Sequence, residues 1–147
     1  MTPDDAVDAV DPADAARGIP DGELEALHRV ELAGEWFERA FGTLLEAHHC
    51  TGRAQALLLE AAEALRRAGR PELAERARRV AAVDAVHGRW TYQMVDEFRS
   101  HMLDPVRALD EAARGEISGG VRHGFEARMK RRTDGAVTPT EVRTAGR

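Results

Sequence analysis

The sequence contains a single cysteine, Cys50, and a single lysine, Lys130, and only 5% of its 147 residues are aromatic. One cysteine excludes a disulfide scaffold within the chain. No stretch approaches the roughly 18 uncharged apolar residues that a membrane-spanning helix needs, and no basic and then apolar leader opens the chain. We therefore expect a cytoplasmic protein without a membrane segment.

Sequence signatures of common catalytic sites are also absent. The chain has no glycine-rich phosphate loop, no Gly-x-Ser-x-Gly elbow and no Cys-x-x-Cys pair. Its formal net charge is −5, and glutamates interrupt the arginine cluster over residues 66–79, which argues against nucleic acid as the main partner. We therefore favour a non-catalytic structural or interaction protein over an enzyme.

Charges of opposite sign gather at the two ends of the sequence. Residues 1–21 contain six aspartates and one arginine, and prolines interrupt any helix there, so we expect an acidic, disordered arm. Residues 133–147 contain turn formers without an apolar period, and we expect a disordered tail. The basic run before this tail is expected to contact an acidic protein partner or the chain's own acidic arm. It consists of Arg128, Lys130, Arg131 and Arg132.

Helix-forming residues, by contrast, are abundant. In residues 22–132, which we assign to one helical domain, Ala, Leu, Glu and Arg dominate and no useful strand alternation occurs. Gly69-Arg70-Pro71 ends one helical stretch and begins a second, which extends to about Arg114 with an interruption expected at Gly88. A short turn between two long helices predicts an all-α fold built on a long antiparallel helical hairpin.

A heptad repeat marks the face by which the first helix packs. The seam that it predicts contains Leu27, Val30, Gly34, Phe37, Phe41, Leu44, His48, Thr51, Gln55, Leu58, Ala62 and Leu65. The apolar face predicted for the second stretch contains Leu73, Val80, Val83, His87, Trp90, Met94, Phe98, Met102 and Leu109. Such seams are typical of helices that pack at shallow angles in bundles and coiled coils.

A two-helix hairpin encloses no core of its own. Beside the seam lies a second row of residues, Trp36, Ala40, Ala47 and Ala61, which widens the apolar surface. Either a short C-terminal helix around residues 122–132 covers this row, or a second protomer does. We favour a homodimer that completes a four-helix bundle.

The middle of the seam is polar. His48, Thr51 and Gln55 fall there, and the axial rise of a helix places His87 at a similar level of the hairpin, with Trp90 and Tyr92 alongside. Buried polar side chains are costly unless they are paired. This layer therefore either fixes the register of the helices by hydrogen bonds or binds a metal or small ligand.

In the metal-binding alternative, His48 and His87 supply imidazole ligands to Fe, Zn or Mn, with His49, Glu46 and Asp84 nearby. A metal held there could support redox or hydrolytic chemistry.

Other histidines also have acidic residues three positions away, including His28 with Glu31 and His123 with Glu126. The helical phase places His28 and Glu31 opposite the seam, so we expect them on a solvated face. Near the C-terminus, Phe125 is expected to pack back on the hairpin.

Overall fold

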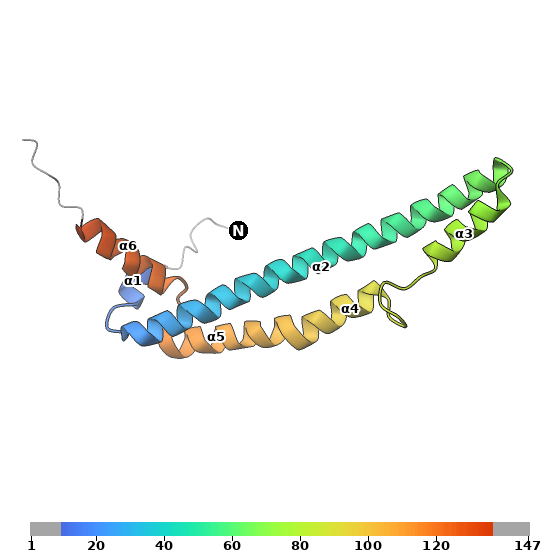
Figure 1. Ribbon diagram of the computed structural model, residues 1–147. Helices are drawn as coiled ribbons and strands as arrows, with labels where there is room; N and C mark the ends of the chain where they lie inside the picture. The colour runs from blue at the N-terminus through green and yellow to red at the C-terminus, as the bar shows by residue number, and fades with distance from the viewer. Residues whose placement is uncertain (1–9, 137–147) are drawn as a thin grey trace, which may run out of the picture. The chain divides into compact units, whose positions relative to one another are not determined.

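The computed structural model describes residues 10–136, and every regular element within them is helical (Figure 1). The elements are α1 (Pro12–Ala15), α2 (Asp21–Arg67), α3 (Pro71–Ala81), α4 (Thr91–Phe98), the π-helix η1 (Arg99–Leu103), α5 (Asp104–Ser118) and α6 (Gly124–Ala136). In this part of the chain the only β-type pairing is an isolated bridge between Val86 and Arg89. The all-α prediction is confirmed, and none of the described helices combines the length and hydropathy needed to cross a bilayer.

The chain divides into two compact units. One, which we call the terminal unit, combines the chain up to Leu32 with the chain from Ala108 onward. The other, the central unit, contains residues 33–107. Both α2 and α5 contribute residues to each unit.

Helix α2 is continuous through Gly34, Gly42 and Gly52. Its sequence has no proline and few β-branched residues, so helix propensity is high along its whole length. All twelve predicted seam positions of α2 are buried or half-buried. The helix ends where Gly69 adopts a φ of 74° and the Arg70 N–H donates to the Leu65 carbonyl at 2.9 Å, which is a Schellman cap before Pro71 begins α3.

The apolar face predicted for the second helical stretch is wrong. Of its nine residues only Met94 and Phe98 are half-buried, and the other seven are exposed. The prediction carried one helical phase over residues 71–114, but the chain leaves the helix between α3 and α4, where Gly88 has a φ of 71°. A new helix starts there with its own phase, so Val95 takes an inward position instead.

The π-helix η1 shifts the phase once more. The Asp104 N–H donates to the Arg99 carbonyl, five residues back, which places one extra residue in the turn. Pro105 has no N–H and would crowd the carbonyl four residues before it in a regular α-helix. The extra residue in η1 accommodates Pro105, so that α4, η1 and α5 follow one another without a gap. Leu103 is fully buried as a result of this register.

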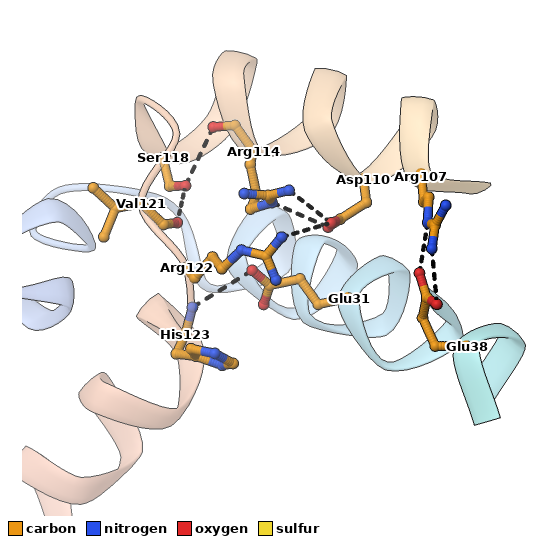
Figure 2. A network of polar contacts seen from close by, with 9 residues as sticks. All are labelled: Glu31, Glu38, Arg107, Asp110, Arg114, Ser118, Val121, Arg122 and His123. Carbon is orange, nitrogen blue, oxygen red and sulfur yellow. Dashed lines mark hydrogen bonds and ion pairs between the residues drawn. The ribbon is translucent and has the colours of Figure 1, made fainter. Parts of the chain in front are cut away.

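The central unit packs aromatic rings between α2 and α4. The Phe98 ring centroid lies 6.4 Å from that of Phe37 and 6.2 Å from that of Phe41. At the edge of this contact, the Arg107 guanidinium donates two hydrogen bonds to the Glu38 carboxylate, at 2.6 and 3.0 Å (Figure 2). A fork of this kind fixes orientation, although its exposed position limits its stabilising effect.

The terminal unit places α1 beside α6 (Figure 1). The Asp11 carboxylate accepts a hydrogen bond from the Ala13 N–H at 2.8 Å and caps α1. Ala13 and Ala16 are buried. A Cβ on Gly124 would lie 3.3 Å from the Cβ of Ala16, so the absence of a side chain at Gly124 allows this close approach.

Arginines of α6 hold this contact by charge. Arg128 donates to the carbonyls of Ala16 and Ile19 and pairs with Asp21. Arg131 pairs with Asp11 and Asp14, and Arg132 pairs with Asp21. We call these contacts of Arg128, Arg131 and Arg132 the arginine clasp. The basic run therefore contacts the chain's own acidic segment, one of the two alternatives drawn from the sequence, while Lys130 is exposed.

This contact departs from the disordered arm expected over residues 1–21. The sequence does contain the N-cap Asp11 and the first proline of α1, Pro12. The order of so polar a segment depends, however, on ion pairs with arginines more than 100 residues away. Helix α6 likewise extends to Ala136, inside the segment expected to form a disordered tail. The rest of the expected arm and tail, residues 1–9 and 137–147, lies outside the described residues.

Replacing Arg128 by Ala is expected to loosen α6. The Arg128 side chain is only 19% exposed and satisfies two backbone carbonyls as well as Asp21. Hydrogen bonds to charged groups are worth about 1.5–3 kcal/mol, so we expect a loss of about 2 kcal/mol and faster amide hydrogen exchange in α6. Lys130→Ala, on the exposed side of the same helix, should change neither quantity; equal effects of the two variants would contradict the clasp.

The arginine clasp should also weaken in acid. Hydrogen bonds from Arg132 and Arg128 lower the pKa of Asp21, and the Ala13 N–H together with Arg131 lowers that of Asp11. A carboxyl whose pKa is lowered on folding stabilises the fold above its unfolded pKa, about 4, and loses this effect as the pH falls through the folded value. We expect α6 amide NMR signals to shift toward those of an undocked helix below pH ~4, and Asp21→Asn to show a smaller shift.

Candidate functional site

A pocket of about 360 Å³ opens in the central unit where α2 passes the segment between α3 and α4. Six of the residues predicted for the polar seam or the metal site line it: His48, Thr51, Gln55, Asp84, Trp90 and Tyr92. Small residues complete the wall, among them Gly52 and Ala82. The pocket thus gathers side chains from α2 and from the segment that leads from α3 into α4.

Three α2 side chains at this pocket form hydrogen bonds within the chain. Nδ1 of His48 and Oγ1 of Thr91 share a hydrogen bond of 2.7 Å that joins α2 to the first residue of α4. The Gln55 amide donates to the Val83 carbonyl at 3.3 Å. The Thr51 hydroxyl donates to the Ala47 carbonyl, one turn back on α2, at 2.7 Å. Two of these bonds cross between segments, so they fix the level at which α2 faces α4.

Two aromatic residues form the outer wall of the pocket. The Trp90 and Tyr92 rings meet edge to face with centroids 5.6 Å apart. The Gln93 side-chain carbonyl accepts the Trp90 N–H at 2.9 Å, which caps the start of α4. Trp90 is 63% exposed and Tyr92 47%, so both remain largely accessible to solvent.

The proposed ligands around His48 do not gather into one coordination sphere. His87 is exposed and does not line the pocket. His49 is exposed, with its ring centroid 5.5 Å from that of His48. Glu46 accepts a contact of 3.5 Å from Cys50, and Asp84 stands on the pocket rim. Over residues 10–136, the only three ligand-type side chains with their ligand atoms mutually within 4.8 Å belong to a different group.

Cys50 is exposed. Its hydrogen bond to Glu46 and the negative charge of that carboxylate raise the pKa of the thiol. A thiol of raised pKa is a weak nucleophile at neutral pH.

The three ligand-type side chains whose ligand atoms do lie mutually within 4.8 Å are those of His28, Glu31 and Glu126, in the terminal unit. The prediction that His28 and Glu31 lie on a solvated face is wrong, because both are half-buried. The ring of Phe125 stacks on that of His28 with centroids 4.5 Å apart and planes 13° apart. The i, i+3 spacing of His28 and Glu31 was a usable signal. The heptad phase misplaced the pair because it accounted for one packing partner of α2, whereas α6 covers the opposite face.

The surroundings of Glu31 act on its pKa in two opposing directions. Burial raises its pKa, and the negative charge of Glu126 acts in the same direction. The His123 backbone N–H opposes them by donating to Glu31 at 3.5 Å (Figure 2). His123 has a φ of 60°, so the chain makes a left-handed turn to present this N–H. Two carboxylates therefore lie close together beside a half-buried imidazole.

A second polar cluster of the terminal unit holds the chain that leads into this turn. Arg114 donates two hydrogen bonds to Asp110, at 3.2 and 2.8 Å, and each side chain is only 14% exposed (Figure 2). The Ser118 hydroxyl donates to the Val121 carbonyl at 2.6 Å. Arg122 approaches Asp110 at 3.9 Å. These contacts order the segment between α5 and α6 and thereby position His123.

Comparison with known proteins finds no matching family model, no matching curated protein and no matching solved structure.

Removal of the Thr91 hydroxyl should destabilise the central unit. Thr91→Val keeps the shape of the side chain but leaves a half-buried His48 Nδ1 without its partner, which typically costs about 1–3 kcal/mol in unfolding free energy. Thr91→Ser retains the hydroxyl and should keep most of the stability. Urea denaturation followed by circular dichroism measures both, and a Thr91→Val variant as stable as the parent would show that the bond contributes nothing.

Proposed function

We propose that this chain is a non-catalytic helical interaction protein that pairs with a second copy of itself through α2, while the polar seam fixes the register within each copy. The supporting observation is a stripe of ten uncharged residues on α2 that are all exposed. It contains Ala33, Trp36, Ala40, Thr43, Ala47, Cys50, Ala54, Leu57, Ala61 and Ala64. We call it the exposed stripe.

The exposed stripe has the spacing of a helix-packing seam. Its residues are spaced alternately by three and four positions, like the predicted seam of α2 beside it, and their side chains are all apolar or small. Together the two seams occupy four of the seven heptad positions, an arc of about 140° on an ideal helix. A single packing face spans about 100°, so α2 presents enough apolar surface for a second partner.

The core that the chain buries alone is small. In the described part of the chain, the large side chains that are fully buried are Leu24, Leu27 and Leu103. On the exposed stripe, Trp36 is 65% exposed and Leu57 46%. Burying these side chains gains roughly 25 cal/mol for each Å² of apolar surface, which favours association.

Shape favours an antiparallel pair of α2 helices with a twofold axis near residues 48 and 49. In that arrangement Trp36 faces Ala61 of the second copy, Leu57 faces Ala40, and Ala47 faces Cys50. Each large side chain thus meets a small one, and alanines allow the two helix axes to approach closely. The Thr43 hydroxyl already donates to the Arg39 carbonyl at 2.9 Å, so its hydrogen-bonding capacity is met within its own helix.

Charge favours the same antiparallel register. Arg39, Glu46, Arg53 and Glu60 follow one another at seven-residue intervals along one border of the exposed stripe. The pairing described above sets Arg39 opposite Glu60 and Glu46 opposite Arg53, in both directions across the twofold axis. None of the four forms an ion pair within residues 10–136. Within the chain, Glu46 accepts the Cys50 thiol hydrogen bond and Arg39 lies over the Trp36 ring, but the alternating signs of the four residues are unpaired among the described residues and fit a second copy.

The alternative of a metal site centred on His48 and His87 has less support. Nδ1 of His48 already bonds to Thr91, and His87 is exposed outside the pocket. The hydrogen bonds of the polar seam favour its role in helix register.

A charge swap on α2 tests the proposed pairing. In the Arg53→Glu variant, the Glu46 carboxylate of each copy faces a second carboxylate at position 53 of the other, so the repulsion occurs twice in each dimer. An exposed ion pair contributes about 0.5 kcal/mol, so replacing two attractions by repulsions should cost about 1–2 kcal/mol and weaken dimerisation about tenfold. The double variant Glu46→Arg with Arg53→Glu restores both pairs and should dimerise like the parent.

Sedimentation equilibrium over a concentration series measures these constants. No Asp, Glu, Lys or Arg residue lies three or four positions from residue 46 or 53, so the swap leaves intrahelical ion pairs unchanged. A parent chain that stays monomeric at micromolar concentration, or a double variant no better than Arg53→Glu, would refute the antiparallel dimer.

A further inference from the structure

The nitrogen Nδ1 of His28 is the one buried side-chain polar atom in residues 10–136 without a hydrogen-bond partner. It lies 3.3 Å from Oε1 of Glu126, close enough for electrostatic attraction but without the direction of a hydrogen bond. The His28 side chain is only 19% exposed. A buried nitrogen without a partner costs free energy, so the site is more stable when something occupies the lone pair of Nδ1.

We propose that His28, Glu31 and Glu126 bind a divalent transition-metal ion of the Zn²⁺ type, and that the ion fastens α6 to the first turns of α2. The three ligand atoms lie mutually within 4.8 Å. Ligand bonds of about 2.0 Å in a tetrahedral site place neighbouring ligand atoms about 3.3 Å apart, which matches the separation of His28 Nδ1 and Glu126 Oε1. The remaining ligand distances close by side-chain rotation of the two glutamates.

Charge supports this ion class. Two carboxylates and a neutral imidazole carry a charge of −2, which a divalent cation neutralises. The ion would also remove the repulsion between Glu31 and Glu126. A mixed set of one nitrogen and two oxygens favours Zn²⁺ and its first-row neighbours over Mg²⁺, which prefers oxygen ligands alone.

The surroundings of His28 orient its ring as a ligand. The near-parallel stack with Phe125 fixes the plane of the imidazole from α6. The His123 N–H holds Glu31 from the turn before α6. His123 also brings its own Nδ1 to 3.5 Å from Oε1 of Glu126 and thereby supports this ligand from the outside.

Isothermal titration of the full chain with Zn²⁺, without a polyhistidine tag and after removal of metals with EDTA, tests the site. We expect saturable binding of one Zn²⁺ per chain, with Mg²⁺ bound at least about tenfold more weakly. Glu126→Gln keeps the shape of the side chain and removes one ligand, so the affinity for Zn²⁺ should fall at least about tenfold. Glu116→Gln, at an exposed position of α5, is the matched control and should bind like the parent.

Hydrogen exchange supplies a second readout. Zn²⁺ should slow amide exchange in α6 of the parent chain and of Glu116→Gln, but not of Glu126→Gln. If Glu126→Gln by itself releases α6, its exchange without Zn²⁺ will show this, and Glu31→Gln then takes its place with the same expectations.

Three outcomes would overturn the proposal. One is the absence of saturable binding at millimolar Zn²⁺, which would leave only an ion pair between His28 and Glu126. The second is unchanged affinity in Glu126→Gln and Glu31→Gln. The third is loss of binding in a variant with His49→Ala and Cys50→Ser, which would move the metal to the exposed side chains of the central unit.

Discussion

The distribution of charge on α2 is the constraint on which the rest of the structure depends. Over residues 33–67, every Asp, Glu, Lys and Arg side chain falls on three of the seven heptad positions, and the other four positions carry none. A helix with so wide a charge-free arc needs partners on two faces. Within the chain, the partners described for the central unit cover one face only. The incomplete core and the exposed stripe both follow from this arrangement.

The polar groups on the two uncharged faces of α2 differ in where their hydrogen-bond partners lie. On the face with the predicted seam, His48 bonds to Thr91 and Gln55 bonds to Val83, so each bond depends on how α2 lies along another segment of the central unit. On the exposed stripe, Thr43 and Cys50 bond to atoms of their own helix. A surface whose polar groups are satisfied locally can associate and dissociate without leaving them unpaired. The first face is thus suited to a permanent contact and the second to an exchangeable one.

The sequence predicts features that depend on one helix and its immediate neighbour. The seven-residue repeat of α2 predicted twelve inward positions, all of which are buried or half-buried, and it placed His48, Thr51 and Gln55 beside Trp90 and Tyr92. The sequence did not predict the buried face of the second helical stretch, because the break at Gly88 and the π-helix η1 before Pro105 each change the helical phase. A helical phase cannot be carried across such irregularities.

The spacing of His28 and Glu31 was visible in the sequence, but the sequence did not predict that Glu126 joins them. The members of this group are separated by almost the whole chain, and they meet only because α6 returns to the first turns of α2. That return depends on Phe125, on the left-handed turn at His123 and on the arginine clasp, none of which either local His–Glu spacing indicates.

The terminal unit combines apolar packing with charge. Leu24 and Leu27 are fully buried there, and ion pairs and hydrogen bonds of the α6 arginines add to this packing. Exposed ion pairs such as those of Arg131 and Arg132 are individually weak and are screened by salt, so they add little free energy to the docking of α6. An ion that binds only the docked state multiplies the docking equilibrium constant by one plus the ratio of the free ion concentration to its Kd, so a single bound ion can change the docked population substantially. A metal ion would thus act on α6 through the group at His28, whereas acid acts on α6 through the carboxylates of the arginine clasp.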